Sequence, residues 1–379
     1  MKIVLVIDQF DDANNGTTIS ARRFAQALKD HGNEVRVIAT GKPADYKYAV
    51  RQMKFFPVVE HLITSQGMRL AVPNKHVFEK AAAWADVVHF LMPSPLAIMG
   101  LKHVEKLGIP HTAAFHCQPE NLTFSLHLGN SRRANDFVYN RFRDVFFNRF
   151  THIHCPSNMI ADQLRRHGYT AQLHVISNGI SPEYTYDKRP KEDWMQGFFN
   201  VLMVGRYSGE KRQDELIEAC AKSRHAKEIQ VILAGKGPLE KKYRKLAEQL
   251  PNPIVMSFYE PERLRELLHM ADLYVHTSDA EIEAMSCMEA FACGLVPVIA
   301  DSPRSATPQF ALDERSLFPA GDTDALAARI DWWIEHPAER QAMELRYAEH
   351  AKQYALEASI RQTEEMFHLA IAEQKAEKA

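Results

Sequence analysis

Short apolar runs alternate with amphipathic segments along the chain, which is the pattern of a parallel sheet whose strands are joined by helices. In the first half of the chain, the predicted strands are Ile3–Ile7, Val35–Ile38, Val87–Leu91 and Ile109–Phe115. In the second half, they are Phe199–Val204, Val231–Ala234, Ile254–Phe258, Leu273–His276 and Val296–Ala300. The sequence therefore predicts the α/β class, with two doubly wound domains.

A polar segment separates the two series of strands. Residues 184–197 contain Pro190 and alternating charges, which is typical of a linker. We therefore predict a first domain of residues 1–188, a second domain of residues 189–355 and a last helical segment of residues 356–379. The total of 379 residues agrees with two domains of ordinary size.

Composition narrows the class of protein. A net charge of −2 with 25% charged residues indicates no general attraction to nucleic acid. The five cysteines are widely spaced and form no Cys-x-x-Cys pair, so neither a disulfide framework nor a zinc site is expected, and we predict a reducing cytoplasm. The N-terminus is apolar only as far as Ile7, which predicts a buried strand rather than a signal peptide or membrane span.

The segment from Glu281 to Glu289 contains the most informative chemistry. A helix is predicted to start between these two acids, so the free backbone N–H groups of Ala284, Met285 and Ser286 would favour an anion. An extended ligand with hydroxyls at both ends and phosphate in the middle, such as a nucleotide-diphosphate sugar, would match this order. The alternative is that Glu281 only stabilises the helix start and Glu289 is a solvated helix residue. However, Glu289 has apolar neighbours in the sequence, where an unpaired carboxylate is costly.

Glycine-containing loops after predicted strands provide further candidates. Arg206 and Lys211 follow Gly205 and could bracket a diphosphate, although basic residues beside a helix start are usually solvated. Gly235 follows the next strand and could shape a nucleotide pocket. Gly16 could let the backbone approach a phosphate or an acceptor, but a glycine before a helix is more often part of a turn.

The spacing of Glu281 and Glu289, followed by Ala-Phe-Ala-Cys-Gly-Leu-Val-Pro-Val, resembles the signature of retaining glycosyltransferases of family 4. The resemblance implies the GT-B fold, with two facing Rossmann-like domains and the nucleotide-sugar site in the cleft. It also implies that Glu281 contacts the transferred sugar and Glu289 the ribose. The sequence departs from the common Gly-Phe-Gly after the first glutamate, because residues 282–284 are Ile-Glu-Ala.

The same resemblance suggests roles for other residues. Residues 205, 206 and 211 match the family's Gly-Arg and Lys positions, and His116 matches a histidine that touches the donor sugar. The last helix would return to the first domain, and Ser177-Asn178-Gly179 resembles the Pro-Asn-Gly turn at the family's domain junction. The expected catalytic residues are His116, Glu281, Arg206 and Lys211.

By analogy with the family, the reaction would be a front-face displacement with retention, needing no covalent nucleophile, cofactor or metal. Asp322-Thr323-Asp324 could suggest a metal site, but Asp322 precedes an apolar-periodic helix and is better explained as its N-cap. Rival functions are a nucleotide-sugar epimerase, a phosphorylase and a non-catalytic nucleotide-sugar sensor.

The acceptor hypothesis rests on the tract from Phe124 to Phe150, which interleaves aromatic residues with five arginines. The four-residue spacing of Phe142, Phe146 and Phe150 predicts one helix face, which would rather pack on its own domain. The other arginines and aromatics could bind an anionic membrane. The runs 116–121 and 302–313 resemble family members that glycosylate diacylglycerol. We therefore expect a peripheral enzyme at the cytoplasmic membrane face that transfers a hexose from UDP-glucose or UDP-galactose to a lipid; a soluble or polysaccharide acceptor is the alternative.

Overall fold

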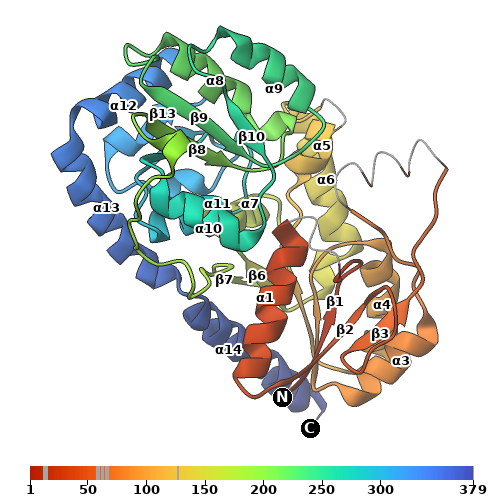
Figure 1. Ribbon diagram of the computed structural model, residues 1–379. Helices are drawn as coiled ribbons and strands as arrows, with labels where there is room; N and C mark the ends of the chain where they lie inside the picture. The colour runs from red at the N-terminus through yellow and green to blue at the C-terminus, as the bar shows by residue number, and fades with distance from the viewer. Residues whose placement is uncertain (12–15, 57–59, 61–63, 65–67, 126–127, 379) are drawn as a thin grey trace. The chain divides into compact units, whose positions relative to one another are not determined.

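The computed structural model describes residues 1–11, 16–56, 60, 64, 68–125 and 128–378 (Figure 1). The chain divides into a first unit, Met1–Asn178 with Leu356–Ala379, and a second unit, Gly179–Ala355. Each unit has its own parallel sheet. The prediction of two Rossmann-like α/β domains is therefore confirmed.

The first unit is built on seven parallel strands in the order β3-β2-β1-β4-β5-β6-β7. Their bounds are β1 Lys2–Val6, β2 Glu34–Thr40, β3 Lys47–Val50, β4 Val87–Phe90, β5 His111–Ala114, β6 His152–Cys155 and β7 Gln172–Val175. Strands β4 and β6 are buried over their whole length and β1 after Lys2, as expected for a sheet covered by helices on both faces.

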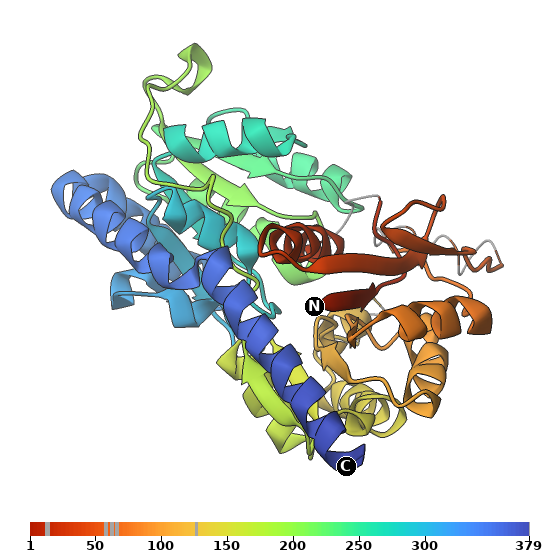
Figure 2. The ribbon, with the colours of Figure 1, turned by 90° about the horizontal axis from the view of Figure 1, so that it is seen from below.

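The helices of the first unit are α1 Gly16–Asp30, α3 Lys75–Trp84, α4 Pro95–Lys106, α5 Pro119–Ser125, α6 Arg132–Val145, α7 Asn158–Arg166 and α14 Leu356–Lys378, with the short η1 Phe147–Arg149. The helix α14, drawn in dark blue, lies beside α1 and against β4, β5 and β6 (Figure 2). Its Ile360, Met366 and Phe367 are buried in the same apolar cluster as Phe24 of α1. The last helix is thus an integral part of the first unit.

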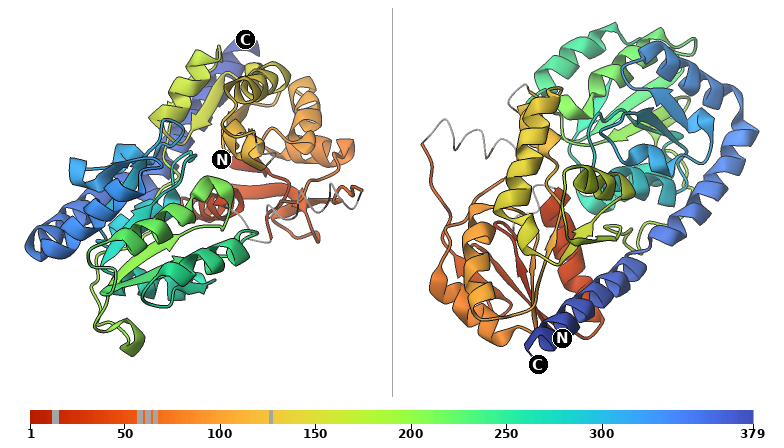
Figure 3. Two further views of the ribbon diagram at one scale, coloured as in Figure 1. Left: turned by 90° about the horizontal axis from the view of Figure 1, so that it is seen from above. Right: turned by 180° about the vertical axis from the view of Figure 1, so that it is seen from behind.

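The second unit contains six parallel strands in the order β10-β9-β8-β11-β12-β13. Their bounds are β8 Phe199–Val204, β9 Ile229–Ala234, β10 Val255–Ser257, β11 Leu273–His276, β12 Pro297–Asp301 and β13 Leu317–Pro319. The main helices are α8 Gln213–Lys222, α9 Glu240–Leu246, α10 Pro261–Met270, α11 Met285–Ala292, α12 Thr323–Glu335 and α13 Pro337–Ala351. Helix α12 packs beside α8, and α13 packs beside α11 (Figure 3).

The units divide at residues 178 and 179, ten residues before the predicted boundary at 188. Residues 179–188 belong to the second unit for two reasons. The Ile180 N–H donates a hydrogen bond of 2.7 Å to Tyr354 O, and Tyr184 is buried in the second unit's core. The turn at Ser177-Asn178-Gly179, with Gly179 in the left-handed region at φ 77°, therefore marks the junction more accurately than the proline-containing segment.

The aromatic tract also differs from the prediction. Helix α6 ends at Val145, and Phe146 leaves helical geometry with φ −135° and ψ −62°, so the three phenylalanines do not share one helix face. Phe146 and Phe150 are nevertheless buried in the first unit, so the packing interpretation holds for these two residues. Residues 126 and 127 of the tract lie outside the described residues.

Candidate active site

Three neighbouring strands of the second unit end next to candidate segments, because Arg206 and Lys211 follow β8, Glu281 follows β11 and the run 302–313 follows β12. Strand β8 ends at Val204, β11 at His276 and β12 at Asp301, and β11 lies between the other two. The strands are parallel, so the loops leave the same edge of the sheet, where ligands of α/β proteins bind.

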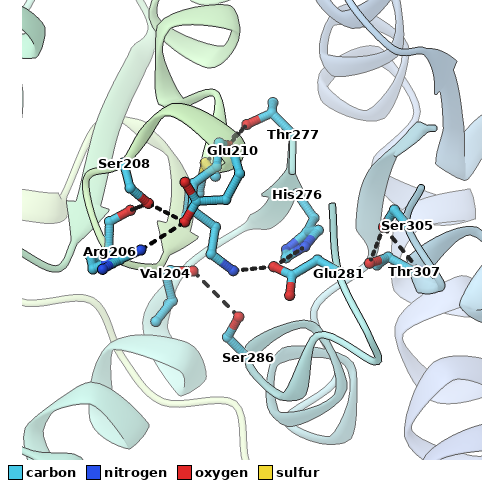
Figure 4. A network of polar contacts seen from close by, with 12 residues as sticks. Val204, Arg206, Ser208, Glu210, His276, Thr277, Glu281, Ser286, Ser305 and Thr307 are labelled. Atoms are coloured by element: carbon cyan, nitrogen blue, oxygen red, sulfur yellow. Dashed lines mark hydrogen bonds and ion pairs between the residues drawn. The ribbon is translucent and has the colours of Figure 1, made fainter. Parts of the chain in front are cut away.

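Glu281 is the centre of a polar cluster with Lys211 and His276, and Figure 4 shows Glu281 beside His276. Its Oε1 forms an ion pair with Lys211 Nζ and lies 3.3 Å from His276 Nε2. Burial alone would raise the pKa of Glu281, but the charge of Lys211 and the contact with His276 outweigh burial and hold the pKa at about 2. Burial lowers the pKa of His276, so a neutral imidazole supports an ionised carboxylate.

Arg206 has a different carboxylate partner. Its Nη2 lies 3.1 Å from Glu210 Oε1, which also accepts a hydrogen bond of 2.5 Å from the Ser208 hydroxyl (Figure 4). The two cations predicted to hold a diphosphate are therefore paired with Glu210 and Glu281. A diphosphate would compete with these carboxylates for the same positive charges.

Helix α11 begins within the predicted segment. Its first residue is Met285, so Glu281 lies on the preceding loop, whereas Glu289 is in the helix and 8% exposed. The Ser286 hydroxyl donates to Val204 O at 3.3 Å and fixes the helix start against the end of β8 (Figure 4). The predicted N-terminal amides and Glu289 thus lie on an element that is attached to the Gly205–Arg206 loop.

Ala284, immediately before α11, has left-handed backbone angles, with φ 63° and ψ 65°. In the resemblance described above, this position corresponds to the second glycine of Gly-Phe-Gly. A residue with a side chain costs roughly 1–2 kcal/mol in this conformation. Ala284 thus adopts this backbone bend although it is not glycine, and its methyl group occupies space at the helix start.

The three candidate glycines have different surroundings. A Cβ on Gly235 would lie 2.0 Å from Gly205 O, so Gly235 is needed where the two loops touch, which is a packing role. A Cβ on Gly205 would make only an ordinary 3.7 Å contact with Lys211. Gly16 is the exposed first residue of α1, with nothing within 4 Å of an added Cβ. Of the three, only Gly205 has Lys211 as its neighbour, and the ligand-binding roles of all three glycines stay predictions.

His116 belongs to the first unit, where it follows β5 and lines a small cavity with His89 and His154. The rings of His116 and His154 pack edge to face with centroids 5.2 Å apart. Burial, followed by the charge of His154, lowers the pKa of His116 to about 3, so its imidazole is neutral. A neutral imidazole can hydrogen-bond a sugar hydroxyl. The role of His116 as a donor-sugar contact stays a prediction.

The tract from Phe124 to Phe150 separates into buried and exposed parts. Tyr139, Phe146, Phe147 and Phe150 are buried, whereas Phe137 is 69% exposed. Arg133, Phe137 and Arg141 are all exposed and repeat every four residues along α6, so they share one face of this helix. None of the described helices is long and apolar enough to span a lipid bilayer.

The structure also confirms one prediction and adds residues that the sequence analysis missed. Asp322 is the N-cap of α12, because its Oδ1 accepts a hydrogen bond of 2.9 Å from Ala325 N. The sequence analysis missed His276 and Glu210. The only signal for His276 was a polar side chain at the end of a buried strand. The only signal for Glu210 was its position next to Lys211. Their importance comes from contacts between separate loops.

Comparison with known proteins places the chain in a family. The family model "Glycosyltransferase Family 4" matches residues 14–184, and "Glycosyl transferases group 1" matches residues 186–353. A GDP-mannose-dependent alpha-mannosyltransferase of Mycobacterium tuberculosis is 23% identical, over 91% of each chain. A GDP-mannose-dependent alpha-(1-6)-phosphatidylinositol dimannoside mannosyltransferase of the same species is 22% identical, over 79% of each chain.

Solved structures share the fold. Sucrose-phosphate synthase of Thermosynechococcus elongatus has a TM-score of 0.79 at 17% identity, covering 98% of this chain and 99% of that one. Anabaena HepE in complex with UDP and glucose has a TM-score of 0.73 at 18% identity, covering 97% and 99%. The catalytic domain of a Helicobacter pylori cholesterol-alpha-glucosyltransferase is 48% identical, with a TM-score of 0.41, covering 41% of this chain and 99% of that one. The two family models together extend from residue 14 to residue 353, and the chain belongs to the glycosyltransferases of family 4 with the GT-B fold.

Proposed function

We propose that this glycosyltransferase moves a hexose, with retention and without a metal or cofactor, from a nucleotide-diphosphate sugar to a diacylglycerol-type lipid. The observation that carries the proposal is the cluster of Lys211, Glu281 and His276 at the ends of β8 and β11, close to the start of α11. It provides a fixed carboxylate for the sugar beside a cation for the diphosphate. We assign the donor to the second unit and the acceptor to the first.

In this reaction the acceptor hydroxyl attacks the anomeric carbon on the face from which the diphosphate leaves. The bond between that carbon and the diphosphate oxygen breaks, and its electron pair goes to the diphosphate. The hydroxyl proton passes to a departing phosphate oxygen. Arg206 and Lys211, together with the start of α11, stabilise the developing negative charge, which is usually the largest single contribution to catalysis.

The donor is UDP-glucose or UDP-galactose in this proposal. The resemblance of residues 116–121 and 302–313 to diacylglycerol-glycosylating family members supports the lipid acceptor, and the donor panel below identifies the sugar and the base. GDP-mannose, which the two curated mannosyltransferases use according to their names, is the competing donor. The name of one of them also includes a phosphatidylinositol-based acceptor, which agrees with a lipid acceptor here.

Helix α6 provides the surface for an anionic membrane. Arg133 and Arg141 flank the exposed Phe137 on one face, so the ring can enter the headgroup layer while the guanidinium groups meet anionic lipids. Each such cation contributes about 1 kcal/mol near an anionic surface. In this proposal, the enzyme is a peripheral protein at the cytoplasmic face of the membrane.

The experiment measures release of nucleoside diphosphate with UDP-glucose, UDP-galactose or GDP-mannose. Each donor is tested without acceptor, with diacylglycerol in vesicles and with water-soluble sugars. We expect release from a UDP-hexose that requires the lipid. Release with a soluble sugar alone would refute the lipid acceptor, sugar interconversion without release would indicate an epimerase, and a requirement for inorganic phosphate would indicate a phosphorylase. Binding without turnover would indicate a sensor.

The membrane surface is tested by vesicle sedimentation. Replacing Arg133 and Arg141 by Gln should reduce binding to anionic vesicles and lipid-dependent turnover, with donor affinity unchanged. The matched control replaces Arg165 and Arg166, two exposed arginines of α7 in the same unit. If the α6 and the α7 double variants lost vesicle binding equally, only the net charge of the protein would matter. This result would contradict a role for this face of α6.

A further inference from the structure

Two residues other than glycine have left-handed backbone angles among those that the structure describes, and both border the proposed donor site. One is Ala284, before α11, and the other is Arg212, with φ 53° and ψ 41°, directly after Lys211. Strained backbone of this kind persists where the surrounding structure enforces it, and it often occurs at functional sites. Arg212 is the more informative of the two because its side chain has partners.

Two acids of α8 hold the guanidinium of Arg212. Its Nε lies 3.2 Å from Asp214 Oδ1, and its Nη1 lies 2.8 Å from Glu215 Oε1. The side chain of Glu215 is only 3% exposed, and its other oxygen accepts a hydrogen bond of 3.3 Å from Gly321 N. Arg212 is therefore the cation that pairs directly with the buried Glu215 carboxylate.

The backbone around Arg212 is connected to the candidate active site. The Thr277 hydroxyl donates to Lys211 O and to Arg212 O, at 2.8 Å in each case. Thr277 is buried and follows His276, whose imidazole contacts Glu281. The orientation of the peptide between Lys211 and Arg212 is thus fixed by the same strand end that supports Glu281.

We propose that Arg212 is a positioning residue, whose ion pairs with Asp214 and Glu215 hold the left-handed turn that aims Lys211 at Glu281. This inference rests on the proposed function, since it assigns the positioning of the donor-site lysine. Glycine would adopt the same turn without strain, but it would leave Glu215 without its cation. The arginine thus couples the direction of Lys211 to the ionisation of a buried acid.

The charges that face Glu215 support this coupling. Burial raises the pKa of Glu215 to about 7, and Arg212 and the Gly321 N–H act against burial. The negative charges of Asp214 and Asp279 act in the same direction as burial. The ionised form, which attracts Arg212 most strongly, therefore becomes dominant as the pH rises through neutrality.

The test compares Arg212→Ala with Arg212→Gly, measuring kcat, the donor KM and the Kd for nucleoside diphosphate. We expect Arg212→Ala to lower kcat about tenfold, equivalent to about 1.4 kcal/mol, since alanine favours a different backbone conformation. Arg212→Gly should recover most of that loss, because glycine accepts the left-handed turn. Equal losses in both variants with a raised donor KM would show that the guanidinium binds the donor itself, and would overturn the proposal.

Two further variants separate positioning from simple loss of stability. Arg224 also pairs with a buried acid, Asp331, in the same unit, so Arg224→Ala should lower the melting temperature and leave kcat unchanged. Glu215→Gln should abolish the rise of kcat with an apparent pKa near 7 that we expect for the wild type. An identical pH profile in Glu215→Gln would overturn the proposal even if the Arg212 variants fail to fold. Wild-type protein without acceptor-dependent transfer would instead refute the proposed function.

Discussion

The ion pair between Lys211 and Glu281 allows a quantitative prediction. The pKa of Glu281 is about 2, compared with an ordinary value of 4.5, although burial acts in the opposite direction. At 1.36 kcal/mol per pKa unit, the native surroundings favour the ionised carboxylate by about 3 kcal/mol. The exposed fractions of the two side chains are 21% and 12%, so solvent screens the pair only weakly. Lys211 is its strongest favourable partner.

The assay is a double-mutant cycle in urea with Lys211→Met, Glu281→Gln and the double variant. Tryptophan fluorescence is suitable because Trp194, Trp332 and Trp333 lie in the second unit. We expect a coupling free energy at pH 7 above about 1 kcal/mol, the upper end of the range for exposed pairs. Because the folded pKa is depressed, this stabilisation is fully present above pH 4.5 and is lost as the pH falls towards 2.

The control is an exposed pair in the same unit, Arg244 and Glu240 on α9, whose side chains are 52% and 41% exposed. Its coupling should be about 0.3–0.5 kcal/mol, as is usual for surface pairs at this helical spacing. A Lys211–Glu281 coupling no larger than that of the control would refute the argument that the protein fixes this carboxylate in its ionised form.

Three further predictions concern the site and the first unit. Glu289→Gln should raise the Kd for nucleoside diphosphate about tenfold, whereas Glu281→Ala should lower turnover at nearly unchanged Kd. Calorimetry measures the Kd of each variant and separates a binding defect from a turnover defect. If Glu281→Ala raised the Kd and Glu289→Gln lowered only turnover, the sugar and the ribose would lie in the opposite order along this segment. Replacing Arg206 or Lys211 by Ala should lower turnover at least about a hundredfold, roughly 3 kcal/mol, while wild-type turnover survives EDTA. Near-normal turnover in these variants, or a strict requirement for a divalent metal, would contradict the assignment of Arg206 and Lys211 to the diphosphate. Burial raises the pKa of Asp8 to about 6, so the folded first unit binds the proton more tightly and should lose stability as the pH rises from 4 to 6. Asp8→Asn should remove this pH dependence in urea titrations that follow Trp84. An unchanged slope of the unfolding free energy against pH would count against this role of Asp8.

Local patterns predicted the framework of both units. Runs such as Val201–Val204 are apolar over their whole length, so a buried central strand is expected from the sequence alone. The strands β3, β6, β7 and β13 were not predicted, because none of them contains more than three consecutive apolar residues. Each of them pairs with a neighbouring strand of its sheet.

The chemistry was only partly predictable, because it depends on contacts between loops that are distant in the sequence. Glu281 and Lys211 were identified from their motifs, but the ion pair between them, 70 residues apart, was not. In the sequence, His276 was only the last residue of a predicted strand. Its role as a support for Glu281 can be recognised only when the order of the strands in the sheet is known. No sequence pattern singled out Arg212, because an arginine with left-handed backbone angles is an exception to the usual backbone preferences.

The stereochemical outcome of a single turnover tests the central claim most directly. An α-linked donor from the panel above is incubated with the enzyme, its lipid acceptor and EDTA, and the product is analysed by NMR. The account predicts an α-linked glycolipid, formed together with one equivalent of nucleoside diphosphate. A β-linked product, free sugar, or no turnover until a divalent metal is added would contradict it.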